Sequence, residues 1–116
     1  MFHTSKISET AAFWENILEL KNHIHTNENR LQYKFGNFMV MFNNVKESPE
    51  DYSQIIAHLG IEFPTKKDVD AQYERLKDKL NIPKPIGGFG KGPYRFYIKD
   101  PNGIPLEFET WEDCSD

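Results

Sequence analysis

One stretch of sequence decides the fold: residues 94–109, which read YRFYIKDPNGIPLEFE. Residues 94–99 and 104–109 are rich in aromatic and branched side chains that alternate with a period of two, as in β-strands. Between them, Pro101 has a fixed φ and Gly103 accepts a positive φ, which suits a tight reversal of the chain. The stretch therefore predicts two antiparallel strands joined by a short turn.

The second of these strands has two different faces. Ile104, Leu106 and Phe108 occupy alternate positions and therefore share one face. Glu107 and Glu109 must then project from the opposite face. Carboxylates in this position are typical either of a solvated strand face or of a binding site, and this strand alone leaves both interpretations open.

Length and composition limit the class of protein. A chain of 116 residues with nine Phe, five Tyr and two Trp can bury the core of one folded domain. The net charge is -4 and no cluster of Lys and Arg offers a basic face for nucleic acid. The only cysteine, Cys114, has no partner for an internal disulfide, and there is neither an apolar leader nor an apolar run of spanning length. We expect a soluble, cytoplasmic protein without nucleic-acid or membrane partners.

The first half of the chain alternates between strand and helix patterns. Ser8 is the expected N-cap of an amphipathic helix that ends near Leu20 and buries Trp14. Strand patterns precede and follow this helix, at residues 1–7, 23–26, 31–35 and 38–42. This half is therefore predicted to have the order βαβββ.

The second half repeats that order after a polar linker, residues 44–53. Residues 54–63 alternate as a strand that points His58 away from its apolar face, and Thr65 to Asp68 have the capping-box pattern of a helix that ends near Leu80. A short strand is expected at residues 82–86, and a glycine-rich loop at 87–92 is expected to form a lip over a site.

These two halves predict an internal repeat. The chain is interpreted as one domain, 1–116, in which module one spans 1–43 and module two spans 54–112. The expected class is α+β, with two βαβββ modules that form a cupped, barrel-like mixed sheet and helices outside. The cup would be lined by the strand faces that carry His58 and Glu107.

Three motifs resemble those of a known superfamily. They are AAFWENIL at residues 11–18, AHLGIEF at 57–63 followed by DVDA at 68–71, and DPNGIPLEF at 100–108. Together they are similar to the vicinal oxygen chelate superfamily, which includes glyoxalases, extradiol dioxygenases, fosfomycin-modifying enzymes and bleomycin-resistance proteins. The resemblance covers nearly the whole chain, and its last motif is the most specific.

The resemblance implies a metal site. Family members with a metal draw ligands from the first and last strands of each module, which gives His58 and Glu107, with Glu107 also the expected catalytic group. Imidazole and carboxylate suit divalent Fe, Mn, Ni or Zn. In module one, His3 is the candidate ligand, whereas Met41 stands where a further carboxylate is expected and its thioether does not suit these ions.

Two functions follow from the resemblance. The first is a glyoxalase-like or dioxygenase-like metalloprotein, a metal-dependent lyase or dioxygenase that acts on a small oxygenated molecule. The alternative is a metal-free small-molecule binding protein of the bleomycin-resistance type, in which acidic side chains attract a cationic ligand. A homodimer is expected in either case. The identity of the substrate, the metal and the reaction is left open, because one scaffold hosts many chemistries.

Overall fold

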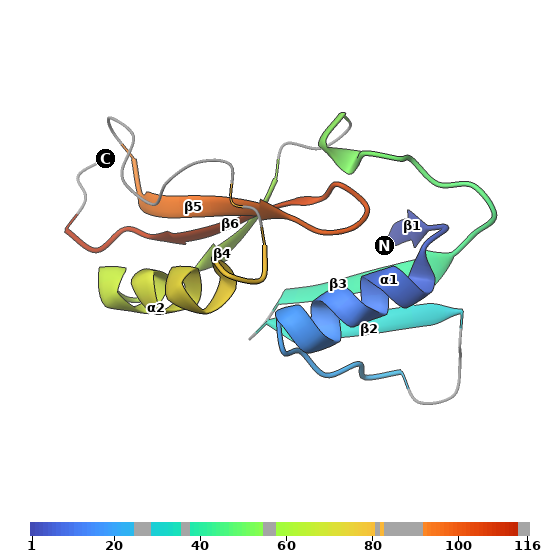
Figure 1. Ribbon diagram of the computed structural model, residues 1–116, viewed down its shortest axis with the longest axis horizontal. Helices are drawn as coiled ribbons and strands as arrows, with labels where there is room; N and C mark the ends of the chain where they lie inside the picture. Colours follow the sequence, from blue (N-terminus) through green and yellow to red (C-terminus); the bar gives the residue numbers. More distant parts are fainter. Residues whose placement is uncertain (25–28, 36–37, 55–57, 81, 83–91, 114–116) are drawn as a thin grey trace. The chain divides into compact units, whose positions relative to one another are not determined.

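The computed structural model describes residues 1–24, 29–35, 38–54, 58–80, 82 and 92–113. The chain divides into two compact units: Met1–Ile56 with Asp100–Ile104, and Ala57–Lys99 with Pro105–Asp116. Each unit combines helix with one three-stranded mixed sheet (Figure 1). The α+β class and the two-module organisation are confirmed. No helix within the described residues is long and apolar enough to cross a membrane.

The first unit places β3 at the centre of its sheet. Its elements are β1 (Phe2–Thr4), α1 (Ile7–Ala12), β2 (Arg30–Phe35) and β3 (Phe38–Asn44). The strand order is β1-β3-β2, with β1 parallel and β2 antiparallel to β3. In Figure 1, α1 lies along one face of β2 and β3.

The helix of the first unit departs from the sequence prediction at both ends. It begins at Ile7 with Lys6 at the N-cap position, so the prediction of Ser8 as the cap is wrong. The Thr4 hydroxyl accepts the Lys6 backbone N–H at 3.0 Å, which starts the helix early. At the other end, Phe13–Ile17 form a π-helical turn in which the Leu18 N–H donates to the Phe13 carbonyl at 3.0 Å.

The expected strand at residues 23–26 is described only in part. His23 donates its backbone N–H to the Gln32 carbonyl at 2.9 Å, so this segment runs beside β2 without forming a regular strand in its described portion. Residues 25–28 lie outside the described residues.

An aromatic cluster forms the core of the first unit. Trp14 is fully buried and stacks on Tyr33, with ring centroids 5.5 Å apart and planes 16° apart. It also meets Phe42 edge-on at 5.3 Å, and the Tyr33 hydroxyl donates to Glu15 Oε2 at 2.8 Å. Stacked and edge-on aromatic pairs contribute stability beyond the area that they bury. The prediction that Trp14 belongs to the core is confirmed.

The second unit repeats the same topology around β6. Its elements are β4 (Leu59–Glu62), α2 (Lys66–Leu76), β5 (Tyr94–Lys99) and β6 (Pro105–Thr110). The strand order is β4-β6-β5, with β4 parallel and β5 antiparallel to β6. The predicted capping box is confirmed, since Thr65 and Asp68 exchange side-chain and backbone hydrogen bonds at the start of α2. The expected strand at 82–86, apart from Ile82, and the glycine-rich loop as far as residue 91 lie outside the described residues.

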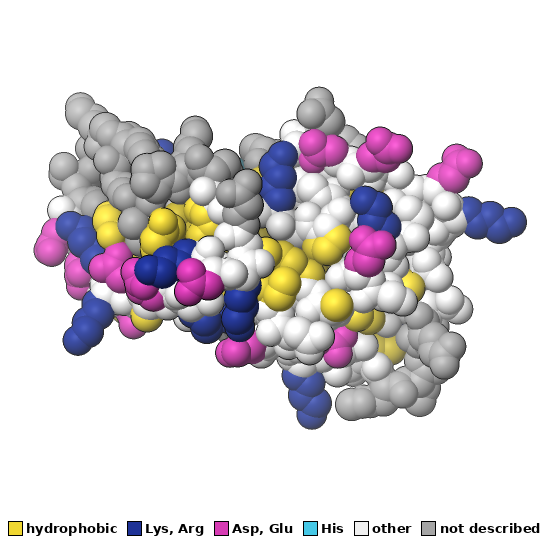
Figure 2. Space-filling view, in the orientation of Figure 1, with side chains coloured by type: hydrophobic (Ala, Val, Ile, Leu, Met, Phe, Trp, Pro, Cys, Tyr) yellow, Lys and Arg dark blue, Asp and Glu magenta, His cyan; other side chains and the backbone are white. Residues whose placement is uncertain are grey.

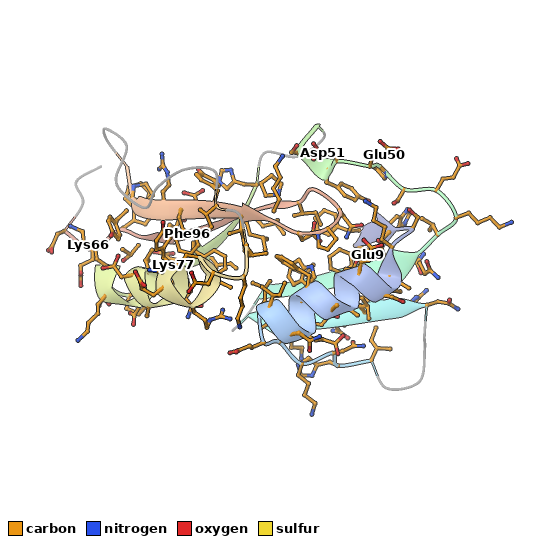
Figure 3. All side chains as sticks on the ribbon, viewed as in Figure 1. Glu9, Glu50, Asp51, Lys66, Lys77 and Phe96 are labelled. Atoms are coloured by element: carbon orange, nitrogen blue, oxygen red, sulfur yellow. The ribbon has the colours of Figure 1, made fainter. Side chains whose placement is uncertain are left out.

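The core of the second unit lies between its sheet and α2. Phe96 is fully buried, stacks on Phe108 at 5.0 Å and meets Tyr73 of α2 edge-on at 5.4 Å. Figure 3 places Phe96 between the sheet and α2. Val69 and Leu76 of α2 are also fully buried. One face of the sheet is therefore occupied by the helix.

The strand registers show how the two modules correspond. Phe2 pairs with Phe42 in the first sheet as Ile61 pairs with Phe108 in the second. This correspondence makes His3 the counterpart of Glu62. By the same register, Met41 is the counterpart of Glu107, as the sequence repeat predicted.

Candidate functional site

The candidate site lies on the face of the second sheet that is opposite α2, called the polar face below. In the strand register, Gly60 and Tyr97 pair with Glu107, while Glu62 and Arg95 pair with Glu109. Because side chains alternate along a strand, these residues share one face, and His58 extends the row two positions before Gly60. The polar face consists of His58, Gly60, Glu62, Arg95, Tyr97, Glu107 and Glu109.

The structure brings together the two residues that the sequence singled out. His58 Nε2 lies 2.7 Å from Glu107 Oε2. The His58 side chain is 42% exposed, whereas that of Glu107 is 4% exposed. A buried carboxylate is costly unless it is paired. Glu107 is thus held on the inside of the site, and His58 connects it to the surface.

Arg95 approaches the other oxygen of the same carboxylate. Its Nε lies 3.7 Å from Glu107 Oε1, and this nitrogen is buried without a hydrogen-bond partner among the described residues. Gly92 makes room for the guanidinium, because a Cβ at that position would lie 3.0 Å from Arg95 Nη1. The positive charge therefore faces Oε1, and Oε2 is directed at His58.

Tyr97 completes the surroundings of Glu107. Its ring meets the His58 ring edge-on at 5.9 Å. Burial raises the pKa of the Tyr97 hydroxyl, and the charge of Glu107 and a hydrogen bond to it raise this pKa further. The sequence pattern alone does not decide which of these side chains faces Glu107, because alternation fixes the spacing of Arg95 and Tyr97 but not the register of the hairpin. The length of the turn could have predicted the register of the hairpin. Lys99 pairs with Pro105, and this pairing places Tyr97 opposite Glu107.

Glu109 lies beside Glu107 and titrates unusually. Burial, a hydrogen bond with Glu107, and charge repulsion from Glu107 and Glu62 together raise the pKa of Glu109 to about 7. Two neighbouring carboxylates cannot both ionise cheaply. Glu109 therefore keeps a proton to near-neutral pH that it can share with Glu107.

The raised pKa of Glu109 predicts a dependence of stability on pH. The folded chain holds this proton to about pH 7, while the unfolded chain releases it near 4.5, so the free energy of unfolding falls as the pH rises through this window. Glu109→Gln should remove the fall, on the order of 1 kcal/mol after solvent screening. Urea unfolding at pH 5 and pH 8 measures the difference.

Glu74→Gln serves as the control for this measurement, because Glu74 lies on the solvent side of α2 beside Lys77. The free energy of unfolding of Glu74→Gln should change with pH by the same amount as that of the parent protein. If the free energy of unfolding of Glu109→Gln still fell between pH 5 and pH 8 as in the parent protein, Glu109 would not be the group responsible for the fall.

The donor atoms of His58 and Glu107 fit two adjacent positions around one metal ion. With bonds of about 2.1 Å to nitrogen and oxygen, neighbouring ligands of an ion are separated by about 3 Å, close to the spacing of Nε2 and Oε2. Among the residues that the structure describes, no three His, Cys, Asp or Glu side chains form a metal-binding group. The pair supplies two ligands and leaves further positions to other donors.

His3 belongs to the first unit. It lies in β1, pairs with Asn43, and its backbone N–H donates to the Tyr52 hydroxyl at 3.0 Å. Its register position corresponds to Glu62 and not to His58. Its role as a ligand stays a prediction.

Comparison with known proteins agrees with this architecture. A family model described as the Glyoxalase/Bleomycin resistance protein/Dioxygenase superfamily matches residues 1–108. A search of curated proteins gave no match.

Solved structures share the fold at low sequence identity. A lactoylglutathione lyase from Agrobacterium tumefaciens has a TM-score of 0.69 at 19% identity, covering 93% of this chain and 87% of that one. A glyoxalase/bleomycin resistance protein/dioxygenase from Alicyclobacillus acidocaldarius has a TM-score of 0.76 at 21% identity, with 96% and 87% covered. With the family match over residues 1–108, the conclusion is that this chain belongs to the glyoxalase/bleomycin resistance protein/dioxygenase superfamily.

Proposed function

We propose that this protein acts on a small oxygenated molecule through a divalent metal ion bound by His58 and Glu107. The observation that carries the proposal is the 2.7 Å approach of His58 Nε2 to Glu107 Oε2 on the polar face. Imidazole nitrogen and carboxylate oxygen together suit Fe, Mn, Ni or Zn. When bound, such an ion supplies a Lewis acid that polarises oxygen atoms of the substrate.

The chain's own residues would orient the ligands and handle protons. Arg95 faces Glu107 Oε1, which leaves Oε2 directed toward His58 and the ion. Groups behind a ligand that fix its orientation strengthen metal binding. Glu109 holds its proton to about pH 7 and is hydrogen-bonded to Glu107, so it can supply or accept a proton next to the reacting centre. Glu107 is the residue that we assign to proton transfer with the substrate.

The first experiment is elemental analysis of protein purified without chelator. We expect near-stoichiometric metal in the parent protein and its loss in His58→Ala, because a single remaining ligand holds an ion poorly. His23→Ala is the matched control and should keep the metal, since His23 is an exposed residue of the first unit. His3→Ala tests the third ligand. Folded parent protein without metal after growth with each candidate ion would refute the proposal.

A second candidate function is metal-free binding of a cationic aromatic molecule. It is favoured by Met41, whose thioether does not suit these metal ions, at the position that corresponds to Glu107, and by the exposed carboxylate of Glu62, which attracts a cation. Chelator-treated protein should then bind a planar aromatic dye that carries a quaternary amine, and Glu62→Gln should weaken the binding. The absence of dye binding to the stripped protein would rule out this function.

We also propose that the protein forms homodimers and is cytoplasmic. Superfamily members often form dimers, which supports the first of these statements. Light scattering at tens of micromolar protein measures the mass directly, and a monomeric mass would exclude the dimer.

A further inference from the structure

The turn between β5 and β6 is buried, unlike most turns. Residues Asp100–Ile104 belong to the first unit, although the two strands that they connect belong to the second. Asp100 is 5% exposed, and Asn102 and Ile104 are fully buried. Connecting segments normally run over the surface. This turn is instead part of the core of the first unit.

Asn102 uses its side chain and its backbone to contact three other segments of that unit. Its Oδ1 accepts a hydrogen bond from the Thr4 hydroxyl at 2.6 Å, and its Nδ2 donates to the Thr10 hydroxyl at 3.0 Å. Its carbonyl accepts the Tyr52 N–H at 2.9 Å. The side chain thus links the end of β1 to the buried side of α1, and the backbone adds the segment that follows β3.

Asp100 makes a second set of buried contacts. Its Oδ2 accepts the indole N–H of Trp14 at 3.0 Å, and its Oδ1 accepts the backbone N–H groups of Asn102 and Ile104 at 2.9 Å each. Without this carboxylate, the indole N–H at the centre of the aromatic cluster would lose its acceptor. A buried donor left without a partner costs more than the hydrogen bond itself contributes.

The described positions of the second unit that correspond to Thr4 and Thr10 carry apolar side chains. By the register and helix correspondence, Thr4 matches Phe63 and Thr10 matches Val69. Thr10 and Val69 are both fully buried and nearly identical in shape, and Phe63 stacks on Phe108. An apolar core therefore suffices at these positions in one unit, while the other carries hydroxyls that meet Asn102.

Two further contacts hold the half-buried residues of the turn, Pro101 and Gly103. A Cβ on Gly103 would lie 2.2 Å from Asp51 Oδ1, and the φ of Gly103 is +77°. Lys6 Nζ donates to the Pro101 carbonyl at 3.2 Å. The positive φ and the close approach to Asp51 explain why glycine occupies position 103.

We infer that Asp100–Ile104 is a clasp that completes the first unit and makes the two units unfold in a single transition. The clasp continues directly into β5 and β6, so it cannot leave its socket without disturbing either the first unit or the hairpin of the second. Residues from the far end of the chain supply the 2.6 Å acceptor of the Thr4 hydroxyl and the 3.0 Å acceptor of the Trp14 indole N–H. Asn102 is the residue on which this coupling depends.

Amide hydrogen exchange of the full chain tests the clasp. In the parent protein, the slowest amides of β3 and β6 should exchange at rates that report one common opening free energy. In Asn102→Ala, the amides of β2 and β3 should exchange roughly 10- to 100-fold faster than in the parent, as expected when the buried Thr4 hydroxyl loses its 2.6 Å acceptor. Those of β5 and β6 should remain slower, so that the single transition separates into two.

Thr10→Val provides a milder variant, because Val69 shows that valine fits this position in the other unit. Like Asn102→Ala, it should make the amides of β2 and β3 exchange faster than in the parent protein, but by a smaller factor. The double variant Thr10→Val/Asn102→Ala should exchange only slightly faster than Asn102→Ala, since both substitutions remove the hydrogen bond between Asn102 and Thr10. Ser5→Ala is the control; it deletes a hydroxyl that meets Ser48 at the surface and should leave exchange unchanged.

Two results would overturn the inference. One is separate opening of β3 and β6 in the parent protein. The other is exchange of β2 and β3 within twofold of the parent in Asn102→Ala or, should that variant not fold, in Thr10→Val.

Discussion

Replacing Glu107 with glutamine is expected to weaken binding of divalent cations by roughly a hundredfold or more. Loss of a group that merely orients a ligand costs 10- to 100-fold in metal affinity, and Glu107 is proposed to be a ligand itself. Glutamine keeps the shape of the side chain but removes the charge that faces His58 at 2.7 Å. Isothermal titration of the chelator-treated protein with Mn, Fe, Ni and Zn measures the change.

Glu62→Gln is the matched control for this prediction. Glu62 is an exposed carboxylate on the same face, paired with Glu109 and not with Glu107. It receives the same substitution and loses the same charge. If both variants lost affinity equally, the cation would be held by the general negative charge of the polar face, and His58 and Glu107 would not form a specific site.

Replacing Phe96 with alanine should destabilise the second unit by about 3–5 kcal/mol. Phe96 is fully buried, and its ring lies between Phe108 in the sheet and Tyr73 in α2. Its removal leaves a cavity that these two rings cannot fill without moving. Because the total stability of a domain is typically about 5–15 kcal/mol, the variant should be close to unfolding at room temperature. The midpoint of urea unfolding measures this loss.

Trp111→Ala is the control for the Phe96 experiment. Trp111 follows β6 in the same unit and is 42% exposed, so its truncation should cost less than about 1 kcal/mol. The loss of stability in Phe96→Leu should lie between those of Phe96→Ala and Trp111→Ala, because leucine retains much of the buried volume. A loss below about 1 kcal/mol in Phe96→Ala would mean that the core repacks, contrary to the close stacking seen here.

Local sequence patterns were sufficient to predict β2, β3, β5, β6, the repeat and the faces of β6. Of the strand predicted at residues 54–63, only Leu59–Glu62 forms a strand among the described residues. Alternation with a period of two fixes the orientation of each side chain along a strand, which is why the separation of Phe108 from Glu107 could be predicted. The strand patterns and the family resemblance together predicted that His58 and Glu107 belong to one site, and their direct contact at 2.7 Å is seen only in the structure. The helix boundaries were harder, because the Thr4 hydroxyl starts α1 before Ser8 and a π-helical turn ends it.

The clasp could not be predicted, because its partners are far apart in the sequence. Asn102 in a turn between two strands has an ordinary local explanation, which hides its hydrogen bond to Thr4, 98 residues away. The burial of Glu107 was missed for a related reason. Its surroundings depend on the hairpin register and on Arg95, and neither follows from the pattern of a single strand.

The buried turn has a consequence for how the protein tolerates substitution. In most proteins, hairpin turns accept replacements and insertions more readily than strands do. Here, replacement of Gly103 would force a side chain against Asp51, and replacement of Asn102 would remove hydrogen bonds to buried hydroxyls of two other segments. A library of random variants should therefore be depleted at Asp100, Asn102 and Gly103 as strongly as at Trp14, and an inserted tag should be tolerated poorly in the very loop that the sequence alone would recommend for it.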